Sequence, residues 1–264
     1  IGDKSNTAQV HPFYFTNYLL ETAKKNGNVK VLIGDVVTGL LVENGMIKGV
    51  SINSNSDIYA DEVILALGPW SKTIASTWLS KEIGNAIENQ IIPEKYYSIV
   101  IQPNEENRQK VPGTALFLKN SSPSSKLSEP EVYPRPTGNI YICGCEEVVS
   151  LPEDPSTVST PIREHIDTLA SVAAQVSTFL NTKGNQPTAK IIKEQACHLP
   201  ISKNGVPIIG NIPNINGLWI ATAHGCWGIL YAPVTGNIIS DLILKGNTNI
   251  LEITPFLPSS LLMK

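Results

Sequence analysis

The sequence predicts a mixed α/β chain in which a layered domain is interrupted by an antiparallel sheet. Three observations support this fold class. An almost wholly apolar run at residues 62–67 is typical of a strand buried on both faces of a parallel sheet. Residues 218–246 indicate a strand, a glycine-rich turn and a long helix. Residues 91–199 contain short β-rich runs with polar spacers, which favours antiparallel strands. We therefore expect one domain from 1–90 and 200–264, and a second from 91–199.

The opening third predicts alternating helices and strands. A helix is expected to begin at Pro12, because proline is tolerated in the first turn of a helix. A strand is expected at 29–33. Asn44-Gly45 then separates two apolar runs, and this dipeptide is the strongest short signal for a hairpin. The apolar run after the hairpin ends at Gly68, where a turn and a short helix are expected.

The middle of the chain predicts the second domain. Residues 160–180 carry apolar side chains spaced by three and four, so we expect one long helix with a single apolar stripe. A serine- and proline-rich stretch at 120–131, between the expected strands, and a second stretch at 151–159 predict exposed loops. The strands are expected at 96–102, 114–119, 132–134, 139–143 and 190–195.

The turn near the C-terminus is the most informative local pattern. It follows an apolar run at 218–223 and contains His224, Gly225 and Gly228. A strand that turns sharply into a helix directs free backbone N–H groups at one point. The helix dipole is positive there, so this position suits an electron-rich or anionic ligand.

Composition excludes few functions. The 264 residues carry a net charge of −3, which disfavours nucleic acid and other polyanions as partners. No apolar run reaches the roughly 18 residues that a membrane helix needs, so no transmembrane segment is expected. Four cysteines indicate intracellular thiols rather than a disulfide scaffold. We expect an intracellular and cytoplasmic protein, with mitochondria or another organelle left open, and the oligomeric state undetermined.

Two blocks of motifs carry a resemblance to a known family. The first is Ala60-Asp61-Glu62-Val-Ile-Leu-Ala-Leu-Gly68-Pro-Trp-Ser71, and the second is Ala223-His-Gly-Cys-Trp-Gly228. In this order they resemble the D-amino-acid-oxidase-like (glycine and sarcosine oxidase-like) FAD-dependent oxidoreductases. The resemblance implies an FAD/NAD(P)-binding-type layered domain with an inserted substrate domain whose sheet covers the flavin. It implies FAD as the cofactor, because the chain shows no protein catalytic triad.

The resemblance also implies site residues. His224 and Trp227 are the candidate catalytic residues, although a neutral histidine that only packs near the flavin is equally compatible. The candidate FAD-binding residues are Val37, Ala66, Leu67, Gly68, Trp70, Cys197, His224, Gly225, Cys226, Trp227, Gly228 and Ile229.

The family's N-terminal Gly-x-Gly-x-x-Gly motif, which seats the pyrophosphate of FAD, has no match in this sequence. We therefore expect this chain to be the C-terminal portion of a longer protein, with the dinucleotide-binding βαβ unit absent from it. The layered domain is accordingly expected to be incomplete.

Cysteines raise two further hypotheses. In sarcosine oxidases a cysteine matching Cys197 is linked to the flavin, so a covalent link is compatible with the pattern. A buried, unlinked cysteine at a strand end, with non-covalent FAD, is favoured. Cys143-x-Cys145 would place two thiols on one face of a strand. A metal would need two more ligands, and none is visible, so buried small residues are favoured over a metal site.

The substrate is the least determined feature. Relatives hold the substrate carboxylate with an arginine or a lysine at positions that are Leu199 and Trp227 here. Arg135 is a replacement anchor in principle, although a solvated loop arginine is favoured. We therefore expect oxidation of the C–N bond of a small amine or amino acid by hydride transfer to the flavin, with oxygen as acceptor. The alternative is a flavin-fold assembly or trafficking factor with little turnover.

Overall fold

The computed structural model describes residues 5, 8–52, 56–119, 129–155, 157 and 160–262. The chain has the predicted mixed α/β fold and divides into two compact units, Ile1–Val63 and Ile64–Lys264. The predicted division into 1–90 with 200–264 and 91–199 stays a prediction. The first unit contains α1 (Pro12–Asn26), β1 (Val37–Glu43), β2 (Met46–Ile52) and β3 (Ser56–Tyr59), and β4 (Val63–Leu65) spans the boundary.

Helix α1 has the predicted start at Pro12, which follows an extended His11. No residue of α1 is buried, and the rings of Phe13 and Tyr14 are exposed. The strand expected at 29–33 is wrong, because these residues are irregular and pair with none of the described strands. A strand needs a neighbour for its backbone hydrogen bonds, so apolar composition alone does not form one.

The predicted hairpin is confirmed. Strands β1 and β2 pair in an antiparallel register, and β3 adds to β2 in a three-stranded sheet. Asn44 and Gly45 connect β1 to β2 with φ values of 51° and 73°. Two successive positive φ angles define the turn type that matches the twist of paired strands, and Asn-Gly is the sequence that adopts it most readily.

The second unit contains two sheets. Its helical elements before the large sheet are η1 (Gly68–Trp70), α2 (Ser71–Trp78) and α3 (Lys81–Gln90). The large-sheet region contains β5 (Ile91–Pro103), α4 (Glu105–Arg108), β6 (Leu116–Phe117), β7 (Glu131–Pro134), β8 (Ile140–Val148), α5 (Arg163–Val176), η3 (Thr178–Leu180) and β9 (Ala189–Ser202). The chain closes with β10 (Ile208–Asn211), β11 (Leu218–Thr222), η4 (Gly225–Trp227), α6 (Gly228–Lys245), η5 (Thr254–Phe256) and η6 (Pro258–Leu262).

The small sheet has the order β10-β11-β4, so the two apolar runs of the family motifs lie in one sheet. Helix α6 packs on it through a core of Ile209, Ile238, Ile239 and Leu242. The expectation that β4 is buried on both faces is wrong, since Ile64 is 47% exposed while Leu65 is buried. An edge strand of three residues has only one neighbour and one covered face.

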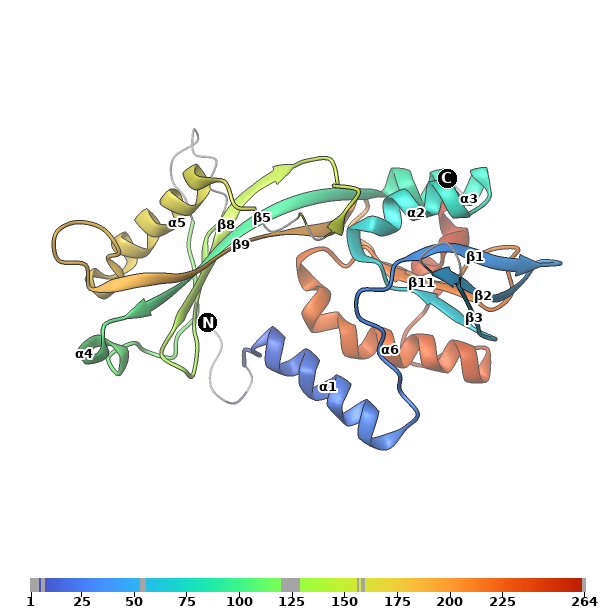
Figure 1. Cartoon of the computed structure of the whole chain (residues 1–264), viewed down its shortest axis with the longest axis horizontal. Coiled ribbons are helices and arrows are strands. Elements are labelled where there is room, and N and C mark those ends of the chain that lie inside the picture. The colour runs from blue at the N-terminus through green and yellow to red at the C-terminus, as the bar shows by residue number, and fades with distance from the viewer. Residues whose placement is uncertain are drawn as a thin grey trace. The chain divides into compact units, whose positions relative to one another are not determined.

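The large sheet is antiparallel, as predicted, and its strand order is β6-β7-β8-β5-β9. Its three long strands β8, β5 and β9 are labelled in Figure 1. Strands β5 and β9 pair along nearly their whole lengths. Helix α5 covers one face of this sheet, where the core includes Tyr97, Ile99, Ile142, Ile166 and Leu169. The opposite face, which we call the polar face, carries Tyr96, Glu131, Tyr133, Tyr141 and Cys143. Residues 120–128, which belong to a predicted loop, lie outside the described residues.

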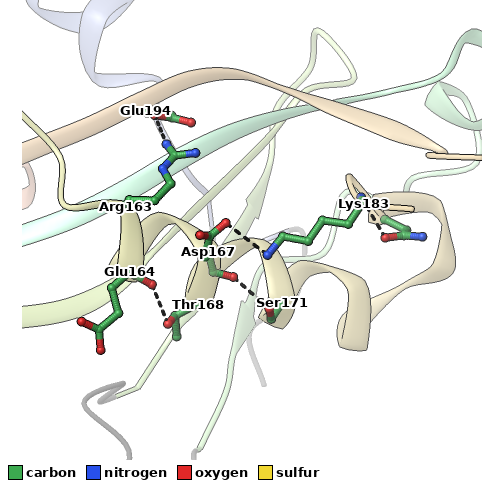
Figure 2. A network of polar contacts seen from close by, with 8 residues as sticks. Arg163, Glu164, Asp167, Thr168, Ser171, Lys183 and Glu194 are labelled. Carbon is green, nitrogen blue, oxygen red and sulfur yellow. Dashed lines mark hydrogen bonds and ion pairs between the residues drawn. The ribbon is translucent and has the colours of Figure 1, made fainter. Parts of the chain in front are cut away.

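The predicted long helix is confirmed with shorter bounds. Its last turn separates as η3, because Ser177 is extended and its hydroxyl oxygen accepts the amide hydrogen of Phe179. Polar contacts fasten the outer side of α5 (Figure 2): Arg163 pairs with Glu194 of β9, and Lys183 pairs with Asp167 at 3.1 Å.

Helix α6 bears on the expectation that the chain has no transmembrane segment. By length and composition alone, Gly225–Lys245 is apolar enough to cross a membrane, with a mean hydropathy of 1.2. Only 22% of that window is buried. One such helix among the described residues is weak support for a membrane span, because helices in other settings pass the same test of length and composition.

Candidate functional site

The turn between β11 and α6 forms the first part of the candidate site. Its backbone is left-handed at Ala223 and Gly225, with φ values of 63° and 56°. A non-glycine residue in this region costs on the order of 1–3 kcal/mol and persists only where its surroundings hold it. The Thr222 hydroxyl donates to the carbonyl oxygen of Gly68 over 2.9 Å. This bond joins the turn after β4 to the turn after β11, so two of the predicted cofactor segments lie together.

The predicted residues around Gly68 differ in their surroundings. Ala66 is exposed and Leu67 is half-buried. The indole N–H of Trp70 donates to the carbonyl oxygen of Pro152 over 3.1 Å, so its polar atom is already engaged. Gly68 has a φ of 53°, a conformation that side chains rarely adopt. The glycine is therefore required by the backbone of the turn.

His224 is held by the helix that follows it. Its Nε2 lies 2.9 Å from the hydroxyl oxygen of Thr235, a buried residue of α6. Burial lowers the pKa of His224, so the imidazole is neutral at pH 7. The ring thus fixes the turn to α6, which favours a positioning role for this residue over a proton shuttle.

The beginning of α6 suits an electron-rich group. Its N-cap residue, Trp227, makes no side-chain capping bond, so the first amides of the helix lack that partner. Cys226, Trp227 and Ile229 are exposed around this helix end. The helix dipole adds positive potential there. Backbone donors beside an open, left-handed glycine turn fit the electron-rich edge of a flavin ring.

This turn lies on the face of the large sheet opposite α5. A Cβ atom built on Gly225 would come within 3.3 Å of Cδ1 of Ile201, which is in β9. Side chains alternate along a strand, so Ile201, Leu199 and Cys197 share that face. Tyr96 pairs with Cys197 across β5 and β9. The turn and the polar face of the large sheet therefore border the same region.

Cys197 differs from the favoured expectation. It is exposed and lies inside β9 rather than buried at a strand end. The long pairing of β9 with β5 carries the strand past this residue. Although solvent reaches Cys197, nearby protein desolvates the thiol and raises its pKa. A raised pKa lowers the thiolate fraction at pH 7, which disfavours attack on a flavin.

The two neighbouring cysteines do not share a face, which corrects the expectation from their spacing. A β-bulge in β8 leaves Cys145 as an extra residue with a φ of 58°. Its side chain enters the core under α5. Cys143 lies on the other face, where its Sγ is 3.8 Å from a carboxylate oxygen of Glu131. One inserted residue reverses the alternation on which the prediction depended.

Sequence reasoning missed most of the polar face. The face carries three tyrosines from three strands, Tyr96, Tyr133 and Tyr141. Burial raises the pKa of each of them above its usual value, so all three hydroxyls stay protonated at neutral pH. The available signal was a tyrosine in each of the predicted strands 96–102, 132–134 and 139–143. It could not show that separate strands bring their rings together.

Charged groups accompany the tyrosines. The hydroxyl of Tyr133 donates to Glu131 over 2.7 Å. Burial and the neighbouring charge of Glu146 raise the pKa of Glu94. Arg135 is half-buried, and its guanidinium carbon lies 5.1 Å from the ring centroid of Tyr141. It is therefore a stacked side chain, which corrects the favoured expectation of a solvated loop arginine.

Two other predictions concern Val37 and metal binding. Val37 begins β1 in the first unit, and its sharing of a site with residues of the second unit stays a prediction. Within the described part of the chain, no group of three or more His, Cys, Asp or Glu side chains is placed to hold a metal ion.

Known proteins resemble the chain over most of its length. It is 26% identical to the oxidoreductase TDA3 of Saccharomyces cerevisiae, whose activity is assigned rather than established, across 98% of this chain and 52% of that protein. It is 27% identical to a glycine oxidase of Pseudomonas putida, across 84% of this chain and 52% of the relative. The chain thus spans about half the length of these curated relatives.

The fold also matches solved structures. The L-proline dehydrogenase of P. horikoshii superposes with a TM-score of 0.68 at 23% identity, covering 94% of this chain and 59% of that one. This likeness concerns the fold. The family described as DAO, FAD dependent oxidoreductase, matches residues 4–242. With that match spanning nearly the whole chain, the protein belongs to the DAO family of FAD-dependent oxidoreductases.

Proposed function

We propose that the protein binds FAD without a covalent link and oxidises the C–N bond of an amine or amino acid. The observation that carries this proposal is the left-handed turn at Ala223–Gly225 beside a face of half-buried tyrosines. Glycine oxidase and D-amino acid dehydrogenase are among the relatives, and both names describe oxidation of an amino acid.

The residues of the second unit would hold the flavin by backbone contacts. Gly68, Gly225 and the first amides of α6 present N–H groups without intervening side chains. Cys197 lies on the adjoining strand with a raised thiol pKa, which supports non-covalent binding. When bound, the flavin supplies a two-electron acceptor.

The reaction moves a hydride and a proton from the substrate. The substrate would lose the hydrogen of the C–H bond beside its nitrogen together with the bonding electron pair, and accepting that pair is the chemistry that a bound flavin would supply. The nitrogen lone pair forms C=N, which makes the nitrogen more positive. Water then hydrolyses the imine to a carbonyl compound and an amine.

The polar face is suited to that change in charge. The carboxylate of Glu131 is oriented by the Tyr133 hydroxyl, which donates a hydrogen bond to it. A fixed carboxylate stabilises positive charge that develops at a nearby nitrogen. The tyrosine faces add a weaker attraction for cations. His224, neutral and bonded to Thr235, keeps the turn in place rather than exchanging protons.

The test is purification of the full-length protein followed by anaerobic mixing with a panel of amines and amino acids. Bleaching of the flavin absorbance by one class is the expected result. Flavin that stays oxidised with every compound would reject the oxidoreductase and favour the assembly factor. Hydrogen peroxide release in air, against turnover only with an added dye, identifies the electron acceptor.

A further inference from the structure

A cavity of about 250 Å³ lies on the α5 side of the large sheet. The sheet contributes Val132 and Pro134 of β7 and Ile140 of β8 to its lining, and all three side chains are buried. They alternate along their strands with Tyr133 and Tyr141, which belong to the polar face. The sheet therefore separates this cavity from the polar face and from the turn that borders it.

The rest of the lining comes from two other parts of the chain. Val176, Phe179 and Leu180 belong to the end of α5 and to η3, while Val111 and Pro112 lie between α4 and β6. Leu180 is part of the buried core under α5, whereas Phe179 and Pro112 are exposed. The cavity is thus apolar in its depth, and it opens to solvent beside Phe179 and Pro112.

The volume of the cavity limits the size of an occupant. An engineered protein cavity of about 150 Å³ lined by apolar side chains holds one benzene molecule. In proportion, a cavity of about 250 Å³ holds roughly eight to ten carbon atoms. A polar group inside it would lose its hydrogen bonds to water without a replacement, which is costly. The interior therefore favours a hydrocarbon chain or ring of this size.

Of the described residues that line the cavity, Lys110 is the one that carries a charge. Its side chain is exposed, and the ammonium nitrogen lies 5.4 Å from the ring centroid of Phe179. The ammonium also donates to Oδ1 of Asn107 over 3.3 Å, and Asn107 is buried. Both partners are neutral, so they orient the ammonium without cancelling its charge. An ammonium has three N–H donors, which leaves donors for an anion.

The potential at the open side of the cavity is positive on balance. Helix α5 ends at Val176, and a helix C-terminus carries about half a negative charge. The full positive charge of Lys110 exceeds this contribution. Within the described part of the chain, no carboxylate forms an ion pair with Lys110. One positive charge beside an apolar cavity is complementary to a ligand with one negative charge and an apolar body.

We propose that this cavity binds a monocarboxylate with an apolar chain of roughly eight carbons, such as a medium-chain fatty acid, with the hydrocarbon inside and the carboxylate at Lys110. This ligand site lies on the face of the sheet opposite the polar face. It is independent of the proposed amine oxidation, because none of the residues that line it takes part in that reaction.

The first test measures the binding of butanoate, hexanoate and octanoate to the full-length FAD protein by calorimetry. Each methylene that enters the cavity should strengthen binding up to roughly fourfold, so octanoate should bind at least about tenfold more tightly than butanoate. Dodecanoate should gain little over octanoate, because its chain is longer than the cavity can hold. Octan-1-ol has the same chain length as octanoate without the charge, and it should bind more weakly than octanoate.

The second test changes the charge at the opening. Lys110→Gln keeps a side chain of similar length, and it should weaken octanoate binding by about threefold to fivefold while leaving octan-1-ol unchanged. Lys110→Glu should reverse the preference, so that octylamine binds more tightly than octanoate. Lys190→Gln is the matched control, because Lys190 is an exposed lysine of β9 at the opposite edge of the sheet. It should leave all three affinities unchanged.

The third test fills the cavity. Val176 is half-buried and lines the cavity, so Val176→Phe should weaken the binding of octanoate and octan-1-ol alike. Melting temperature and flavin occupancy are the folding controls, and the exposed Lys110 variants keep the test decisive if Val176→Phe does not fold.

Three results would overturn the proposal. Absence of octanoate binding, or affinity that does not rise with chain length up to octanoate, would reject the cavity as the site. Octanoate binding that is the same in wild type, Lys110→Gln and Lys110→Glu would reject the carboxylate position. Unchanged binding in a folded Val176→Phe protein would show that octanoate binds elsewhere.

Discussion

Replacing Gly225 by alanine tests whether the left-handed turn builds the site. Gly225 has a φ of 56°, and Gly228, three residues later, has a helical φ of −55°. The two glycines are close in sequence and differ in backbone conformation. They therefore form a matched pair for the same substitution.

The expected cost at Gly225 has two parts. A side chain in the left-handed region destabilises the fold by roughly 1–2 kcal/mol. The new Cβ would also lie 3.3 Å from Cδ1 of Ile201, a distance that requires a small movement of that side chain. At Gly228 the new Cβ would meet the Cβ of His224 at 3.7 Å, which is ordinary contact. Alanine is favoured over glycine in a helix by about 1 kcal/mol, so Gly228→Ala should be neutral or stabilising.

Urea denaturation of the apoprotein measures the stability of each variant, and flavin fluorescence titration measures FAD affinity. We expect Gly225→Ala to lose about 1–2 kcal/mol of unfolding free energy. Gly228→Ala should keep its stability and, if the flavin approaches that backbone, bind FAD more weakly. Equal stability of the two variants would refute the assignment of strain to Gly225, and unchanged FAD affinity in both would refute the placement of the ring.

Three further predictions follow from the same face and turn. Thr235→Val should lower the free energy of unfolding, measured by urea denaturation, by about 1 kcal/mol, because it removes the hydroxyl partner of His224. A loss below a few tenths of a kcal/mol would show that this hydrogen bond does not stabilise the fold. Glu94→Gln should stabilise the fold at pH 7 and have no effect below pH 4. The folded-state pKa of Glu94 is raised, so folding penalises the charged carboxylate, and this penalty disappears when the carboxylate is protonated. Equal effects on the free energy of unfolding at both pH values would contradict this prediction. Acid precipitation of the FAD protein should release all flavin into the supernatant. The raised pKa of the Cys197 thiol disfavours the thiolate that a covalent link to the flavin would need. Flavin that stays with the wild-type precipitate but is released from Cys197→Ser would contradict non-covalent binding.

Local chemistry made several elements predictable from the sequence. Asn44-Gly45 adopts two positive φ angles more readily than other dipeptides, so the hairpin was visible without knowledge of its surroundings. Pro12 tolerates the first turn of a helix because its missing N–H has no partner there. The glycine-rich break before α6 was equally local. In each case the conformational preference belongs to one or two residues.

Distant contacts decided where the sequence-based expectations were wrong. Residues 29–33 are apolar but irregular, because a strand depends on a neighbour that no local pattern specifies. The bulge that separates Cys143 from Cys145 arises in the pairing of β8 with β5, more than forty residues earlier in the chain. One inserted residue changes which face each following side chain occupies.

The sequence by itself determined the α/β class, the local elements with strong turn and capping signals, and the two motif blocks of the family. Only the tertiary structure brought Gly68 to Thr222, His224 to Thr235, and Arg135 onto Tyr141. The physical reason is the range of the interactions. Backbone preferences act within a few residues, whereas a site is made by side chains whose separation in space depends on strand order and register. Arg135 therefore reaches the ring of Tyr141 only when β7 and β8 are paired.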